Sequence, residues 1–269
     1  MSEQEREVRF RKLTQPELAR YVEGEATVII PIGAIEQHAA HLPVETDIYN
    51  AEQVSMEAAR RFDDVLVAPG VPWGLSHAHV ELGGTISVQP TTFLALAMDI
   101  TETLIRAGFS RQLWVNGHHG NKPVMGLIMY EAKRLHGLSV GTITYYDLAV
   151  DAFGSVRRTE LGGSGHACEF ETSLMMHLSP ESVRNHEGVR RPIEPRTPKD
   201  FRDLADPGLT GIGYTFPERF PEGVMGDPTV ATEEAGGAIF ESALEGVVEF
   251  LEVFRKLSPD GRQELAPRT

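Results

Sequence analysis

The sequence predicts an α/β protein with a central, mostly parallel sheet and helices on both faces. Short apolar, β-branched runs alternate with longer segments whose apolar residues recur every three or four positions, over most of residues 14–146. That alternation is typical of a parallel sheet covered on both sides. The chain has 269 residues, of which 41% are hydrophobic, so it can bury one large core or two small ones.

The strands are predicted from the buried apolar runs, and the helices from their caps and periodic stripes. The runs at 26–31, 64–68, 112–116 and 139–145 are interpreted as strands. Thr14–Glu17 is a capping-box pattern with a proline in the first turn, and Thr232 is a candidate cap for the last helix. Helices are expected at 14–22, 47–61, 92–108, 121–136, 166–177 and 232–256.

The chain is interpreted as one domain with flexible ends. We expect residues 1–12 to be flexible, 13–257 to form the domain and 258–269 to form a flexible tail. Residues 178–228 are rich in Pro, Gly, Arg and Asp and show little periodicity. Because they contain no apolar stripe of their own, they are predicted to be long loops of the same domain. Loops of that length are usually functional.

Composition argues against several classes of protein. The formal net charge of −14 disfavours a nucleic-acid partner, because phosphates are bound by clustered Lys and Arg. Cys168 is the only cysteine, so an internal disulfide is impossible and a reducing compartment is expected. The charged N-terminus lacks a signal-peptide core, and no apolar run approaches the about 20 residues of a membrane span. We therefore expect a cytoplasmic protein with no membrane partner.

Residues with metal-binding chemistry follow two of the predicted strands. Glu36 and His38 follow the first strand, at a spacing that points both to one side of an extended backbone. Asp47 lies where the next helix begins, and His118 follows the third strand. Sites in open parallel sheets lie beyond the carboxyl ends of the strands, so these four side chains can converge if the two strands are neighbours. Carboxylates with imidazoles suit Zn, Mn or Fe(II), and Asp47 could bridge two ions.

A third group of candidate residues surrounds His166. On a helix that begins at 166, His166 and Glu169 would share a face at i, i+3, whereas Glu171 would point elsewhere. Only one of the two glutamates should therefore join His166. Glu169 is the candidate for a fifth metal ligand, and His166 is the candidate proton donor or acceptor.

Simpler interpretations are favoured for the other candidates. His41 is expected to pack or to hydrogen-bond behind the site, and Cys168 to be a small buried residue rather than a nucleophile. His77 and His79 lie in a predicted loop at 70–90, and we expect them at the solvent or the pocket rim.

Four motifs jointly resemble those of the creatininase (creatinine amidohydrolase) family. They are PIGAIEQHAAHLPVETD at 31–47, GGTIS at 83–87, VNGHHGN at 115–121 and HACEFETS at 166–173. In order and spacing they cover roughly residues 14–180. The resemblance implies a single α/β domain with a parallel sheet, a centre of two divalent ions, and homo-oligomers that are often hexamers.

The resemblance also implies roles for individual residues. One ion, Zn or Mn or alternatively Fe(II), would be held by Glu36, Asp47 and His118. The other would be held by His38, Asp47 and a further glutamate. In creatininase itself that glutamate falls at the position of Gly120, so Glu169 is expected to take its place here. His166 matches the catalytic histidine of the family, and His119 and Tyr146 are expected beside the substrate.

The implied activity is that of a metal-dependent hydrolase. A metal-bound hydroxide would cleave a C–N bond, in an amide or a cyclic amide, of a small polar molecule. The enzyme is expected to be an amidohydrolase that acts on non-peptide, cyclic amides. The alternative is the hydrolytic C–C ring opening of a cyclic diketone derived from inositol, by the same dinuclear centre. A third hypothesis, of another class, is an oligomeric sugar- or nucleotide-binding protein that keeps the fold without turnover. The nearly complete ligand set argues against it.

Overall fold

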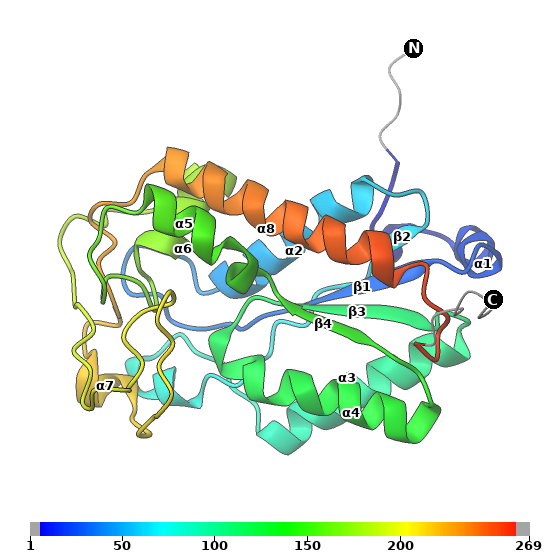
Figure 1. Ribbon diagram of the computed structural model, residues 1–269, viewed down its shortest axis with the longest axis horizontal. Coiled ribbons are helices and arrows are strands. Elements are labelled where there is room, and N and C mark those ends of the chain that lie inside the picture. The colour runs from blue at the N-terminus through cyan, green and yellow to red at the C-terminus, as the bar shows by residue number, and fades with distance from the viewer. Residues whose placement is uncertain (1–5, 262–269) are drawn as a thin grey trace, which may run out of the picture.

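The sheet has four parallel strands in the order β2-β1-β3-β4, as the computed structural model of the chain shows for residues 6–261 (Figure 1). The strands are β1 (Thr27–Ile32), β2 (Val65–Val67), β3 (Arg111–Asn116) and β4 (Gly141–Thr144). Because β1 pairs with β3 over its whole length, the first and third predicted strands are neighbours. The polar segments that follow these two strands therefore begin at the same edge of the sheet.

Helices cover both faces of this sheet, which confirms the predicted fold class (Figure 1). One face carries α2 (Thr46–Arg60), α5 (Val150–Val156), α6 (Glu169–Leu178) and α8 (Glu233–Phe254). The other carries α1 (Gln15–Glu23), α3 (Pro90–Arg106) and α4 (Lys122–His136). A short α7 (Phe216–Arg219) and 3-10 turns complete the chain, at Phe10–Lys12, His77–Leu82, His119–Asn121, Tyr145–Ala149 and Pro180–Ser182.

The strands are apolar throughout because both of their faces are buried. In β1, Ile29 packs into the core under α2 and α8, whereas Val28 and Ile30 pack into the core over α3 and α4. Leu113 and Trp114 of β3 divide between the two cores in the same way. Strands of this kind read as continuous hydrophobic runs rather than as alternating ones.

The predicted caps at both ends of the domain are confirmed. Thr14 and Glu17 form the capping box of α1, and the Thr232 side chain accepts a hydrogen bond from Ala235 N at the start of α8. The helix expected from His166 begins only at Glu169. That difference of three residues changes which glutamate faces the site.

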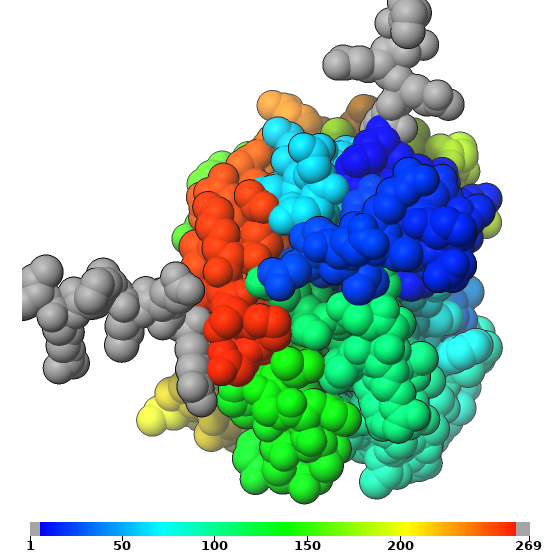
Figure 2. Space-filling model, turned by 90° about the vertical axis from the view of Figure 1, so that its right-hand side faces the viewer, coloured from blue at the N-terminus to red at the C-terminus, as the bar shows by residue number. Residues whose placement is uncertain are grey.

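Part of each terminus that we expected to be flexible packs against the domain. Val8 is buried and its carbonyl oxygen accepts a hydrogen bond from Val67 N, so residues 6–12 extend the structure beside β2. At the other end, Ser139 N donates to Pro259 O. Figure 2 faces this end of the molecule and shows the blue N-terminal and red C-terminal residues side by side. Residues 1–5 and 262–269 lie outside the described part of the chain.

Residues 178–228, which we call the loop segment, lie at the opposite end, beyond the carboxyl ends of the strands (Figure 1). They are mostly irregular, as predicted. They nevertheless form a small apolar core of their own, with Ile193, Phe216, Phe220 and Met225 buried. Ala78 and Leu82 of the 3-10 turn His77–Leu82 pack against that core. The loop segment is therefore fixed onto the turn that carries His79.

Candidate metal centre and pocket

The carboxyl ends of β1 and β3 bring four of the predicted residues into one buried cluster. Glu36 and His38 follow β1, Asp47 lies in the first turn of α2, and His118 follows β3. All four are buried, and Glu36 and His38 completely so. The convergence results from the pairing of two strands that are far apart in the sequence.

A close backbone approach places His118 beside Asp47. Gly117 lies directly against the first turn of α2, where a Cβ atom would collide with the carbonyl oxygen of Asp47. Only glycine allows this approach. The requirement explains the glycine in the motif at 115–121.

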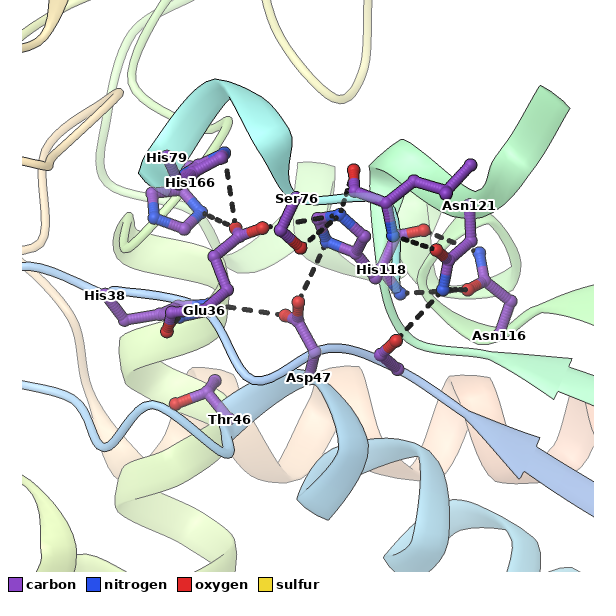
Figure 3. A network of polar contacts seen from close by, with 12 residues as sticks. Glu36, His38, Thr46, Asp47, Ser76, His79, Asn116, His118, Asn121 and His166 are labelled. Atoms are coloured by element: carbon purple, nitrogen blue, oxygen red, sulfur yellow. Dashed lines mark hydrogen bonds and ion pairs between the residues drawn. The ribbon is translucent and has the colours of Figure 1, made fainter. Parts of the chain in front are cut away.

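Asp47 lies between two imidazoles (Figure 3). Its Oδ1 is 3.2 Å from His38 Nε2, and its Oδ2 is 2.9 Å from His118 Nδ1. The two carboxylate oxygens thus face different histidines. This is the geometry that a carboxylate needs if it is to share its oxygens between two cations.

Glu36 lies on the other side of His118 and faces two further histidines (Figure 3). Its Oε2 is 3.3 Å from His118 Nε2. Its Oε1 is 3.2 Å from His166 Nδ1 and 3.4 Å from His79 Nε2. A buried carboxylate is therefore surrounded by three imidazoles from three separate segments.

Burial and charge act against each other in this cluster. Burial raises the pKa of Glu36 to about 7, although His118 opposes the shift. Burial would also raise the pKa of Asp47, but His38 and His118 outweigh it and hold that pKa well below its usual value. Burial would lower the pKa of His118, whereas Glu36 and Asp47 raise it to about 9. In the absence of cations, protonated imidazoles compensate the buried carboxylates.

The donor set fits divalent cations. Neither oxygen of Glu36, nor His38 Nε2, has a hydrogen-bond partner among the described residues, although all three are buried. Such orphaned atoms are costly unless a ligand satisfies them. In each of three groups of residues, the possible ligand atoms lie within 4.8 Å of one another. The groups are Glu36, Asp47 and His118; His38, His166 and Glu171; and Glu36, His79 and His166. Mixed imidazole and carboxylate sets of this kind suit Zn, Mn or Fe(II).

The structure places Glu171, and not the expected Glu169, beside the cluster. Both oxygens of Glu169 are occupied, because Oε1 accepts from Arg158 N at 2.6 Å and Oε2 accepts from Thr159 N at 3.0 Å. The Oε1 of Glu171 instead lies 3.8 Å from His38 Nε2. The prediction failed because it placed His166 on the helix, and the i, i+3 relation therefore does not apply.

The backbone before α6 accounts for this difference. Ala167 has a φ of 48°, in the left-handed region, so the chain turns sharply between His166 and the helix. The N–H of Ala167 donates to Glu171 Oε2, which fixes the glutamate under the turn. Strained non-glycine residues of this kind are concentrated at functional sites.

The comparison with known proteins agrees with this geometry. The sequence profile of the family described as "Creatininase: Creatinine amidohydrolase" matches residues 11–251. The chain belongs to the creatininase family.

Three relatives are named as hydrolases of different substrates. A mycofactocin precursor peptide peptidase from Mycobacterium tuberculosis is 30% identical over 239 residues, covering 82% of this chain and 83% of that protein. A creatinine amidohydrolase from Pseudomonas putida is 27% identical over 246 residues, covering 86% and 90%. A 3-dehydro-scyllo-inosose hydrolase from Thermotoga maritima is 24% identical over 270 residues, covering 94% and 83%. The chain is thus a creatininase-family hydrolase whose substrate these names do not specify.

A solved structure described as "Creatininase Mn" has the same fold. It superposes with a TM-score of 0.79 at 27% identity, and the match covers 93% of this chain and 99% of that one. Within this family fold, Gly120 is tightly enclosed. A Cβ atom there would lie 2.5 Å from His118 Nε2 and would also collide with the carbonyl oxygen of Leu75. The present backbone therefore has no room for a glutamate at that position.

His79 belongs to the cluster, contrary to the expectation that it lies at the solvent or the pocket rim. It is 7% exposed, and its ring stacks on Phe216 with a centroid distance of 3.7 Å. No motif in the sequence links His79 to Glu36. Only the packing of the loop segment brings the turn that carries His79 over the site. His77 is exposed, as expected.

Gln37 defines which nitrogen of His79 carries the proton. Its Oε1 accepts from Ala39 N at 3.0 Å, so its Nε2 faces His79 Nδ1, also at 3.0 Å, and donates to it. His79 then carries its proton on Nε2, toward Glu36. His166 has the opposite orientation, because its Nε2 lies 2.7 Å from Gln37 O and must donate, which leaves the Nδ1 lone pair facing Glu36.

The interpretations of His41 and Cys168 agree with the structure. His41 is buried behind the cluster, with Nε2 3.0 Å from Thr172 Oγ1. Cys168 is fully buried, and burial raises the pKa of its thiol far above the usual value. An inert thiol of this kind is not a nucleophile.

A cavity of about 450 Å³ opens over the cluster. Glu36, Asp47, His118, His166 and Glu171 form its polar base. His119 and Tyr146, the two expected substrate-binding residues, both line it, and their rings are stacked with centroids 6.4 Å apart. The Tyr146 hydroxyl is buried and has no hydrogen-bond partner among the described residues. It can therefore donate to a ligand.

Proposed function

We propose that this creatininase-family protein is a metal-dependent hydrolase that cleaves a C–N bond next to a carbonyl group. The observation that supports this most is the convergence of three carboxylates and four imidazoles in one cluster, all but His38 lining the same cavity. Two divalent ions, Zn or Mn, would occupy the centre. When bound, they would activate water and polarise the carbonyl group of the substrate.

We assign the holding of these ions to five residues. Glu36, Asp47 and His118 would hold one ion, and His38, Asp47 and Glu171 the other. The position of Asp47 between His38 and His118 supports its role as the shared ligand. Glu171 replaces Glu169 in this assignment because its carboxylate faces His38.

The remaining polar groups would manage protons and orient the substrate. His166 Nδ1 can accept a proton at the cavity base and return it to the leaving group. The Tyr146 hydroxyl can donate a hydrogen bond to a substrate oxygen, whereas the Nε2–H of His79 faces Glu36. His119 contributes a wall of the cavity.

The C–N bond is favoured because two of the relatives are named as a peptidase and an amidohydrolase, which both hydrolyse such bonds. The Thermotoga maritima relative supports the alternative, the ring opening of a cyclic diketone derived from inositol by the same centre. A panel of lactams, formamides, short peptides and cyclic diketones would separate the two.

The deciding experiment measures metal content by mass spectrometry, together with activity. Wild type should hold about two equivalents, Asp47→Ala should lose both metal and activity, and His166→Ala should keep metal but lose about 10²-fold or more in kcat. One equivalent would indicate a mononuclear site. Absence of metal after reconstitution would reject the hydrolase mechanism and favour a binding protein.

A further inference from the structure

The cavity over the cluster of carboxylates and imidazoles becomes apolar where the loop segment lines it. Its base is polar, whereas its outer wall is formed by apolar side chains of the loop segment. These are Ile193, Phe201, Leu204, Ile212, Phe216 and Met225. A ligand that fills about 450 Å³ and touches this wall must carry an apolar body.

Arg219 is the one arginine or lysine among the described residues that line this cavity. It is half-buried, and its guanidinium lies 4.8 Å from the ring centroid of Tyr214 and 5.1 Å from that of Phe220. Its Nη2 donates to Glu194 O at 2.7 Å. The rings and this hydrogen bond fix the group in place and leave other N–H groups available.

Four of the five other arginines in the loop segment have carboxylate partners, whereas Arg219 has none within ion-pair distance among the described residues. Each of four others has a carboxylate oxygen at 3.9 Å or less: Arg190, Arg191, Arg196 and Arg202. Arg196 makes the best comparison, because it also lies over the Tyr214 ring, at 5.4 Å, but does not line the cavity. Asp200, which also lines the cavity, interacts with Arg219 only at longer range. A planar, pre-oriented guanidinium without a direct ion pair is suited to bind a carboxylate.

We propose that the substrate is an amide that carries an apolar body and a carboxylate, and that Arg219 binds this carboxylate. The proposal rests on the proposed hydrolase function. In a chain of net charge −14, an anionic substrate needs a local cation of this kind. Hydrolysis of such a compound adds the elements of water across the C–N bond, with the hydroxyl going to the acyl carbon and the proton to the amine nitrogen.

Three compounds test the two features separately. N-acetyl-L-phenylalanine has both the apolar body and the carboxylate, N-acetylphenethylamine lacks only the carboxylate, and N-acetylglycine lacks the apolar body. Their dissociation constants are measured by calorimetry on the metal-loaded protein, and the release of acetate is followed by chromatography. N-acetyl-L-phenylalanine should bind about tenfold or more tightly than N-acetylphenethylamine, which corresponds to one charge-assisted contact. It should also bind about tenfold or more tightly than N-acetylglycine, which corresponds to burial of the apolar body.

Variants of the two arginines on the Tyr214 ring provide the matched control. Arg219→Gln should remove the preference for N-acetyl-L-phenylalanine and leave the affinity for N-acetylphenethylamine unchanged. Arg219→Lys, which keeps the charge but not the planar fork, should retain part of the preference and replaces Arg219→Gln if that variant does not fold. Arg196→Gln should leave the preference intact.

The outcomes separate this proposal from the function on which it rests. Equal affinity for the two aromatic compounds, or a preference that survives in Arg219→Gln, would overturn the proposal that Arg219 is the anchor for the substrate carboxylate. If acetate is released from both aromatic compounds with equal KM, the hydrolase function stands and the anchor is wrong. A carboxylate preference without metal-dependent hydrolysis of any amide would support the anchor and reject the proposed function.

Discussion

At the residue scale, Glu169 and Glu171 of α6 form a matched pair for mutation, because they lie on the same helix but their carboxylates contact different groups. Glu171→Gln should reduce the metal content, because it removes the carboxylate charge beside His38. Glu169→Gln should keep both ions but lower the free energy of unfolding by about 1–3 kcal/mol, because it disturbs hydrogen bonds to Arg158 and Thr159. Mass spectrometry and urea unfolding measure the two effects. Metal loss in Glu169→Gln alone would reverse the assignment.

A second prediction at the residue scale concerns the proton on His79. Gln37→Leu removes the donor to His79 Nδ1, so the Nδ1–H tautomer should become populated. Long-range ¹H–¹⁵N correlation spectra of the zinc-loaded protein distinguish the tautomers. His41, which bonds to Thr172 instead, should keep its signals and serves as the control. If the His79 signals do not change in the variant, Gln37 does not set its tautomer.

At the scale of elements, a buried ion pair joins the loop segment to the turn after α5. Arg157 donates to both oxygens of Asp203, at 3.0 and 2.8 Å, and Ser164 Oγ and Gly162 N also donate to this carboxylate. Asp203 is completely buried. Removal of one partner of such a pair leaves an uncompensated buried charge, so Asp203→Asn should cost about 3 kcal/mol or more of unfolding free energy at pH 7.

The same pair makes stability depend on pH. Burial would raise the pKa of Asp203, but the hydrogen bonds from Arg157 and Ser164 outweigh it and hold the pKa below its usual value. Because the folded-state pKa is the lower one, the stabilisation is complete above the unfolded-state pKa of about 4 and is lost as the pH falls through the folded-state value. Urea unfolding between pH 7 and 3 should therefore show a smaller loss in Asp203→Asn than in wild type. Parallel losses would contradict this account.

The elements that sequence predicted well are those with local causes. Thr14 and Thr232 cap their helices through contacts within four residues, and the run at 26–31 is apolar because both faces of β1 are buried. Glu169 was mispredicted because the left-handed turn at Ala167 has no signature in an alanine. His79 was missed because its place depends on tertiary packing by residues more than a hundred positions away, such as Phe216.

At the scale of the whole molecule, the described residues contain no helix long and apolar enough to cross a membrane. We expect the chain to form a homo-oligomer, as its resemblance to the creatininase family implies. The exposed side of α4 supports this, because Leu127 and Tyr130, at i and i+3 on one helix, are 48% and 62% exposed. Apolar groups gathered in this way often mark an interface.

Light scattering on the purified protein tests this expectation. A hexamer would have about six times the chain mass of 29.6 kDa. Tyr130→Glu would place a charge in the interface and should lower the mass, whereas Val253→Glu, at an exposed site on α8, should not. A wild-type mass of one chain at micromolar concentration would contradict the oligomer. An oligomer unaffected by Tyr130→Glu would place its interface on another face, because a buried unpaired charge in the contact could not be tolerated without cost.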